Sequence, residues 1–148
     1  MNWTYCRFSE LGVDDLYDAL ALRAQVFVVE QACIFQDADG VDRHSGHLLG
    51  RDEAGALLAY LRVVDPGVKY AEASIGRVIT TLATRGSGLG RALVAQGVAR
   101  CTAAWPGQAM RINAQSRLER FYGDFGFARD GADYIEDGIP HCEMVRPG

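Results

Sequence analysis

The sequence predicts a single α/β domain of the α+β kind over residues 1–148, with a mixed, mostly antiparallel sheet and helices on both faces. A chain of 148 residues has the size of one domain, which buries about 68–70% of its unfolded surface. Two apolar runs separated by a turn at residues 52–55 predict an antiparallel hairpin. A strand, a glycine-rich turn, a helix and another strand then predict one parallel pair.

The N-terminal part predicts an edge strand followed by a helix. Residues 3–8 are aromatic and β-prone, which favours a strand, and Asp14 is suited to be the N-cap of the helix. One helical face should be formed by residues spaced four, three and four apart, namely Leu16, Leu20, Arg23 and Phe27. Arg23 is unusual there, and two interpretations are equally open: it packs and pairs with a carboxylate, or it belongs to a substrate site.

Residues 32–45 form a 14-residue segment without a periodic pattern, and a loop of this length is usually functional or mobile. Three aspartates in it resemble a calcium loop, but the glycine stands at the fourth position rather than the sixth. Position twelve is Leu48 rather than a bidentate Glu. His44 and His47 could bind zinc together with Cys33 or His141, but nothing in their spacing requires it, and isolated histidines near a turn are more often caps or surface groups. We therefore expect no bound metal.

The remaining elements follow from turn signals and periodicity. Proline at position 106 ends the helix that begins after the glycine-rich turn. A short helix is expected at residues 116–124. The expected strands lie at residues 47–51, 56–64, 71–81 and 109–115, the last two parallel, with a closing antiparallel pair at residues 127–134 and 141–146 around Asp137-Gly138.

The glycine-rich turn at residues 85–90 is the segment that points to a ligand class. Glycines at positions 86, 88 and 90 remove the Cβ atoms that would hold a ligand away from the backbone, and they permit positive φ. The helix that follows has free N–H groups and roughly half a positive charge at its start. Arg85 and Arg91 flank the turn. This combination favours a phosphate ligand.

Two common phosphate sites do not fit the turn. A nucleotide P-loop requires a lysine directly after its last glycine, whereas the chain has a single lysine, Lys69. A dinucleotide fingerprint requires a third glycine where Arg91 stands, and an acidic residue about twenty positions later, where Met110 and Arg111 stand.

The motif Arg85-x-x-Gly88-x-Gly90 resembles the pyrophosphate loop of the GNAT acetyltransferases. Residues 110–127, with Asn113, Phe121-Tyr122 and Gly126-Phe127, resemble the second block of that family, with Gln115 where Asn is usual and Leu118 where Ala is usual. Three further motifs, at residues 23–31, 36–42 and 136–144, resemble the ElaA-like branch, so the resemblance covers nearly the whole chain.

The resemblance implies acetyl-CoA as co-substrate, bound where the parallel pair of strands splays apart. In the family the pantetheine arm pairs with the strand before the glycine turn, here Val78, Ile79 and Thr80. Tyr122 takes the place of the tyrosine that donates a proton to the departing thiolate, and its ordinary pKa near 10 keeps it protonated. The other implied cofactor-binding residues are Arg85, Gly86, Ser87, Gly88, Leu89, Gly90, Arg91 and Gln115.

The implied activity is direct acetyl transfer to a primary amine of a small-molecule or peptide acceptor, without a metal. The motifs do not identify the acceptor; its contacts are expected at Arg23, Glu30 and His141. The general base stays open between a water relay and four side chains: Glu30, Glu72, His141 and Glu143. The alternative is a non-catalytic module that senses acetyl-CoA or another phosphate ligand. The tyrosine at position 122 favours the enzyme.

Composition narrows the partners and the location. A net charge of −4 has the wrong sign for a protein that neutralises many nucleic-acid phosphates. No basic and apolar leader and no apolar run approaching 18 residues is present, so we expect a cytoplasmic protein without a membrane partner. Four isolated cysteines predict reduced thiols. A homodimer is compatible with the apolar content.

Overall fold

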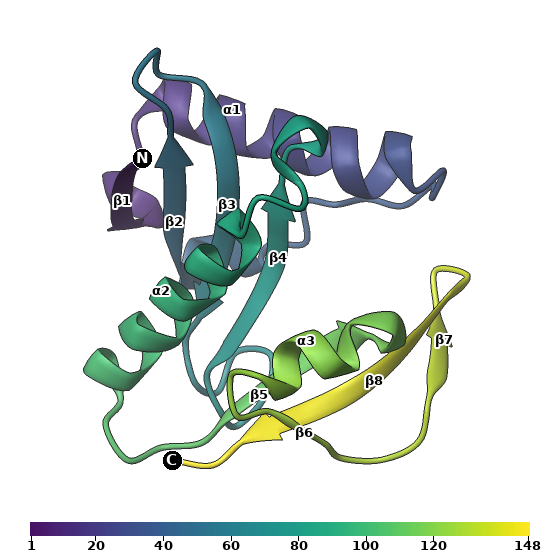
Figure 1. Cartoon of the computed structure of the whole chain (residues 1–148). Helices are drawn as coiled ribbons and strands as arrows, with labels where there is room; N and C mark the ends of the chain where they lie inside the picture. The colour runs from purple at the N-terminus through teal and green to yellow at the C-terminus, as the bar shows by residue number, and fades with distance from the viewer.

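Eight strands form two sheets that are joined at one end and then diverge (Figure 1). The computed structural model describes residues 1–148. The first sheet has the order β1-β2-β3-β4 and consists of β1 (Asn2–Arg7), β2 (Ser45–Arg51), β3 (Leu57–Val64) and β4 (Ser74–Thr80). The second has the order β5-β8-β6, with β7 also on β8, and consists of β5 (Met110–Gln115), β6 (Ala128–Arg129), β7 (Tyr134–Glu136) and β8 (Ile139–Arg146).

Three α-helices and several short helical turns connect the strands. None of the helices has the length and apolar composition needed to cross a bilayer. The helix α1 (Val13–Arg23) continues into a π-helix, η2 (Ala24–Glu30), whereas α2 (Leu89–Ala104) crosses from β4 to β5 and α3 (Glu119–Gly123) follows β5. The 3-10 turns are η1 (Phe8–Glu10), η3 (Val41–His44), η4 (Leu82–Thr84) and η5 (Ser116–Leu118).

Helices cover both faces of the first sheet, as predicted, because its strands alternate between two cores. Leu61 of β3 points to the larger core, which also contains Leu93 of α2. Tyr60, its neighbour, points to a smaller core with Ala19 of α1. A Cβ at Gly97 would lie 2.8 Å from Cδ2 of Leu61, so α2 approaches the sheet closely only because this residue is glycine.

The parallel pair of β4 and β5 is reduced to a single bridge. Ala73 pairs with Met110, and the N–H of Arg111 donates to the carbonyl of Ala73 at 3.0 Å. Beyond this point the two strands separate, which confirms the predicted splayed arrangement. The edge of β4 that faces β5 is therefore free of any strand over most of its length.

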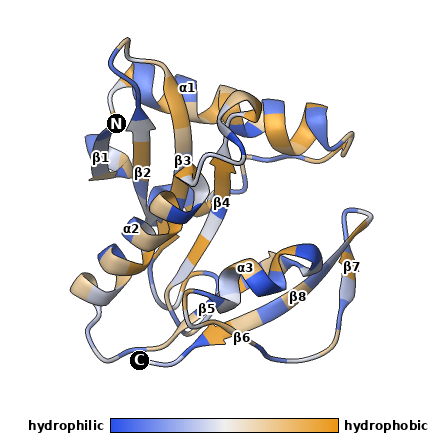
Figure 2. Ribbon diagram, viewed as in Figure 1, coloured by the Kyte–Doolittle hydropathy of each residue, from blue (hydrophilic) through white to orange (hydrophobic).

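The second sheet has one apolar and one polar face. Along β8, the buried Cys142 and Met144 of the larger core alternate with His141 and Glu143, which are partly exposed. Figure 2 shows hydrophobic and hydrophilic segments along this strand. Pairing with β5 places Gln115 opposite His141 and Asn113 opposite Glu143. Asn113, Gln115 and His141 of this face line the opening between the two sheets.

Two details of the prediction are wrong. The N-cap of α1 is Gly12, which has an extended backbone, and Asp14 lies within the first turn of the helix. Its carboxylate there complements the positive end of the helix dipole. The strand expected at residues 127–134 is divided into β6 and β7, because Gly131 has a left-handed φ of 108° that interrupts the extended backbone.

Candidate active site

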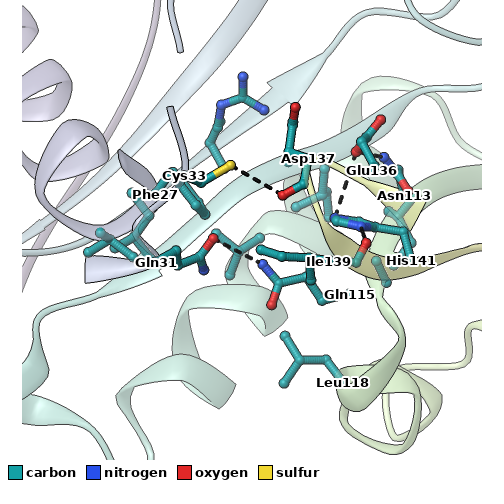
Figure 3. A pocket seen from close by; sticks show the side chains of 18 of the residues that line it. Phe27, Gln31, Cys33, Asn113, Gln115, Leu118, Glu136, Asp137, Ile139 and His141 are labelled. Atoms are coloured by element: carbon teal, nitrogen blue, oxygen red, sulfur yellow. Dashed lines mark hydrogen bonds and ion pairs between the residues drawn. The ribbon is translucent and has the colours of Figure 1, made fainter. Parts of the chain in front are cut away.

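A cleft of about 370 Å³ lies where β4 and β5 separate. Its walls come mainly from β4, β5, the π-helix η2 with the residues after it, the turn η5, and the turn between β7 and β8 (Figure 3). Lys69, Arg85 and Tyr122 of α3 complete the lining. The π-helix directs Phe27 and Glu30 to the cleft, in agreement with the frequent occurrence of such helices at functional sites. The volume of the cleft lies within the range of small-molecule binding sites.

The β4 wall offers backbone groups to a ligand. Val78, Ile79 and Thr80, which were predicted to hold the pantetheine arm, all line the cleft. An unpaired strand edge can accept an extended ligand as an additional strand.

A bulge in β4 shapes this wall, and sequence reasoning missed it. Tyr60 pairs with Ile79 and Arg62 pairs with Gly76, so Arg77 and Val78 together oppose one residue of β3. Arg77 has a φ of 51°, in the left-handed region that non-glycine residues rarely adopt. No local signal in an apolar, β-branched strand indicates such a residue.

The side chain of Arg77 fixes the long loop beside the cleft. Its Nε donates to Oδ1 of Asp37 at 2.7 Å. Its guanidinium also lies 5.8 Å from the ring centroids of both Phe27 and Phe35, in a cation–π arrangement. The loop at residues 32–45 is thereby held against the cleft wall.

The glycine-rich turn has the features of an anion site. Gly86 and Gly88 have φ values of 82° and 87°, and a Cβ at either position would meet no atom within 4 Å. The turn is thus open rather than crowded. Backbone N–H groups that donate to no carbonyl are found at Gly86, Gly88, Leu89, Gly90 and Arg91. Free donors at the start of the 16-residue helix α2 suit a phosphate group.

Only one residue of this turn also lines the cleft. Arg85 does so, and it pairs with Glu30 of η2 at 2.8 Å. Arg91 points elsewhere, with its guanidinium 3.0 Å from Asp124 and 5.6 Å from the ring centroid of Phe121. The residues of the turn outside the cleft lining are Gly86, Ser87, Gly88, Leu89, Gly90 and Arg91.

Tyr122 of α3 lines the cleft and is 8% exposed. Its ring is held by edge contacts with Phe121 and Phe127, at centroid distances of 5.2 and 6.2 Å. The hydroxyl has no hydrogen-bond partner within the protein. Burial raises the pKa of Tyr122 to about 12, so the side chain is protonated at neutral pH and able to donate.

Gln115 contributes the opposite wall near the π-helix. Its Nε2 lies 3.5 Å from Oε1 of Gln31, a long contact across the cleft that Figure 3 shows, and its Oε1 accepts from Nε of Arg117 at 3.1 Å. The amide is accessible to a ligand in the cleft.

A polar cluster at the other end of the cleft surrounds His141 (Figure 3). Nδ1 of His141 donates to the carbonyl of Ile139 at 2.7 Å, which leaves Nε2 as the acceptor nitrogen of a neutral ring. Nε2 lies 3.7 Å from Oε2 of Glu136, and Nδ2 of Asn113 donates to the same oxygen at 2.7 Å. Tyr134 donates to Oδ1 of Asn113 and stacks on His141 with ring centroids 6.3 Å apart.

Sequence reasoning did not identify Glu136 and Asn113 as site residues. Both belong to motifs that the family resemblance rests on, which was the available signal. Their convergence depends on the pairing of β5 and β7 with β8, which places residues more than twenty positions apart side by side.

The candidates for the general base differ in their position relative to the cleft. Glu30 lines the cleft but is paired with Arg85, whereas Glu72 and Glu143 lie outside it and pair with Arg111 at 3.1 and 2.8 Å. Of the four side chains considered as general base, His141 is the one that lines the cleft without a strong ion pair.

Arg23 does not line the cleft, and its predicted contact with substrate is wrong. Its side chain is 1% exposed, and its guanidinium is occupied by Asp37 and Asp42, each at 2.7 Å. The interpretation as a packed, paired arginine holds instead. Elsewhere, no group of three or more His, Cys, Asp or Glu side chains is arranged to hold a metal ion.

Comparison with known proteins agrees with this geometry. Residues 26–146 match the family model described as an acetyltransferase (GNAT) domain. The chain is 42% identical to a UPF0039 protein of Synechocystis, over 98% of this chain and 94% of that protein. It is 41% identical to protein ElaA of Escherichia coli, over 99% of this chain and 96% of that protein.

Two solved structures are similar over almost the full chain. The crystal structure of Escherichia coli ElaA superposes with a TM-score of 0.92, at 40% identity and 98% coverage of both chains. An acyl-CoA N-acyltransferase from Pseudomonas aeruginosa superposes with a TM-score of 0.93, at 38% identity and 99% coverage of both chains.

Proposed function

The chain belongs to the GNAT acetyltransferase family and is a relative of ElaA, and from this premise we propose that it is an acetyl-CoA-dependent N-acetyltransferase. The acetyl group passes directly to a primary amine of a small acceptor. The observation that carries the proposal is the placement of Tyr122, a protonated and unpartnered hydroxyl in a cleft between a free strand edge and an open anion site.

The residues around the cleft fit acetyl-CoA along its length. The free N–H groups of Gly86 and of residues 88–91, with the flanking Arg85, suit its pyrophosphate. The free edge of β4 at residues 78–80 suits the amides of the pantetheine arm, which would extend the sheet by hydrogen bonding. Gln115 offers an amide donor and acceptor on the facing wall.

Tyr122 and His141 have complementary roles in the reaction. Acetyl-CoA, when bound, supplies an activated thioester whose carbonyl carbon bonds to the amine nitrogen as its C–S bond breaks. Tyr122 donates a proton to the leaving sulfur, and Nε2 of His141 accepts the proton that the amine nitrogen loses. Exchange with solvent then returns Tyr122 to its phenol form and His141 to its neutral form, so that an amide and a free thiol are the net products.

A second candidate function is a module that binds acetyl-CoA or another phosphate ligand without turnover. The open glycine-rich turn supports binding in both cases. The unpartnered hydroxyl of Tyr122 favours the enzyme, because a sensor does not require a proton donor in the cleft.

A substrate screen tests the proposal. The protein is incubated with acetyl-CoA and a panel of small amines, polyamines, amino acids, aminoglycosides and short peptides, while thiol release and the mass of each amine are followed. We expect thiol release with an acetylated amine. Binding of acetyl-CoA in calorimetry without turnover across the panel would favour the sensor, and absence of binding would contradict both functions.

A further inference from the structure

Three of the charged side chains that line the cleft are held in ion pairs. Arg77 is bound to Asp37 at 2.7 Å, and Arg85 is bound to Glu30 at 2.8 Å. Lys69, the single lysine of the chain, lines the cleft without any hydrogen bond or ion pair. Because lysine is strongly hydrated and cationic, a free one in a cleft is suited to an anionic group of a ligand.

Glu136, which also lines the cleft, carries a negative charge. No arginine or lysine pairs with its carboxylate, which accepts from Asn113 at 2.7 Å and lies 3.7 Å from Nε2 of His141. Burial and the nearby Arg62 and Arg77 lower the pKa of Lys69, whereas the charge of Glu136 raises it. Lys69 and Glu136 thus bring opposite charges to the lining of one cleft.

The pair formed by Glu136 and His141 lacks a donor between its two atoms. With Nδ1 of His141 donating to the carbonyl of Ile139, Nε2 of the neutral ring is an acceptor, and so is the carboxylate oxygen. In this neutral tautomer neither atom is able to donate to the other. The N–H groups of an amine placed between them would satisfy both acceptors.

We propose that the acceptor is an amine that also carries a carboxylate, of the amino-acid class. Its amine lies at Glu136 and His141, and its carboxylate lies at Lys69. This inference rests on the proposed function and specifies the substrate class of the same site. It also replaces Arg23, which is buried, with Lys69 as the cationic contact.

Matched substrates isolate the role of the carboxylate. Each L-amino acid is compared with its amide, which keeps the amine and removes the negative charge. We expect the best free acid to have a kcat/KM on the order of tenfold or more above that of its amide, which is the effect of one charge-assisted hydrogen bond. Equal values for acids and amides would overturn the proposal.

Variants locate the contact. Lys69→Met should reduce the ratio of acid to amide to about one, whereas Lys69→Arg should retain the preference. Arg117→Met is the matched control, because it removes another cation of the cleft that pairs with no carboxylate. It should retain the ratio. A Lys69→Met variant with the original ratio would contradict the proposed contact.

The amine end is tested by Glu136→Gln. This variant should raise KM for acid and amide together while the Kd for acetyl-CoA stays unchanged in calorimetry. A KM unaffected for both would overturn the assignment. Mass spectrometry after incubation with acetyl-CoA alone gives a further check, because an acetyl group on Lys69 would identify it as an acceptor and not as an anchor.

Failure of this inference is distinguishable from failure of the proposed function. Turnover confined to amines without a carboxylate, such as polyamines, would support the enzyme and overturn the amino-acid class. Absence of turnover with every amine would overturn the proposed function and this inference together.

Discussion

Nη1 of Arg23 donates to Oδ1 of Asp42 at 2.7 Å, in a position where both side chains are largely withdrawn from solvent. The same oxygen accepts from Nη1 of Arg62 at 3.0 Å, and Nε of Arg23 donates to Asp37 at 2.7 Å. The cluster joins the loop at residues 32–45 to α1 and β3. It is therefore part of the scaffold that holds one wall of the cleft.

Replacing Arg23 with methionine should lower the free energy of unfolding by about 1–3 kcal/mol. The substitution removes charge-assisted hydrogen bonds to two partly buried carboxylates, whereas Asp42 keeps Arg62 and Asp37 keeps Arg77 as cationic partners. Urea unfolding monitored by circular dichroism measures the change. Arg120→Met, which removes an exposed arginine without an ion pair, should change stability by less than about 0.5 kcal/mol.

A role in the acceptor site would give the opposite result for Arg23→Met. The variant would then unfold like the wild type and show a raised KM for the acceptor. Measuring KM at a temperature where the variant is folded separates the two roles.

Stability should fall as the pH is lowered, in two ranges that belong to different groups of this cluster. Burial raises the pKa of Asp42, but the hydrogen bonds and charges of Arg23 and Arg62 outweigh burial and leave it below its usual value. A carboxyl group with a depressed pKa contributes stability above its unfolded pKa near 4 and loses it as the pH falls further.

The higher of the two pH ranges in which stability falls belongs to His47. Burial lowers its pKa, and its Nε2 lies 2.9 Å from the carbonyl of Asp42 while its Nδ1 lies 2.7 Å from the hydroxyl of Tyr60. The unfolded state therefore binds the proton more readily below pH about 6.5, and stability declines from there. Urea midpoints between pH 8 and 3 test this; a flat profile from pH 7 to 5 in the wild type would contradict the role of His47. Glu53→Gln, in an exposed turn, should leave the profile unchanged.

Elements with local signals could be predicted from the sequence. The hairpin of β2 and β3 follows from two apolar runs and a short turn, and α2 follows from the glycine-rich turn and the proline after it. The bulge at Arg77 could not be predicted in this way. It is stabilised by Asp37, forty residues earlier, and by two aromatic rings that only the folded chain brings together.

The same distinction applies to the site. Val78, Arg85 and Tyr122 lie in motifs of contiguous sequence, so their place at the cleft was predictable. Whether Arg23 would pair within the protein or contact a substrate depended on Asp37 and Asp42, which lie 14 and 19 residues later. The contact of Asn113 with Glu136 depends on the strand order of the second sheet, which no short-range pattern specifies.

Gly88→Asp should weaken acetyl-CoA binding by at least about tenfold while the protein stays folded. The substitution places a carboxylate beside the free N–H groups at the start of α2, where it would repel a pyrophosphate and compete for its donors. It also imposes strain, because Gly88 has a φ of 87°. Isothermal titration calorimetry measures the Kd.

Gly107→Asp is the matched control for this strain. Gly107 has a φ of 75° and an open Cβ position, as Gly88 has, but it lies after the C-terminal end of α2, away from the free N–H groups at the start of that helix. It should cost similar stability and leave the Kd for acetyl-CoA within a few-fold of the wild type. Equal Kd values for Gly88→Asp and the wild type would remove the turn from the cofactor site.

Tyr122→Phe should affect the chemical step and not the capture of acetyl-CoA. The substitution removes only the hydroxyl, and the ring keeps its edge contacts with Phe121 and Phe127. Because the hydroxyl has no partner in the protein, its removal leaves no polar group unsatisfied, and stability should stay within about 1 kcal/mol. With the proton donor lost, kcat should fall by ~10²–10⁴ at an unchanged Kd for acetyl-CoA.

Tyr17→Phe, which changes an exposed tyrosine of α1, is the control and should keep the wild-type kcat. Single-turnover kinetics ensure that chemistry is what the measurement reports, and an unaltered rate for Tyr122→Phe under those conditions would return this tyrosine to a packing role.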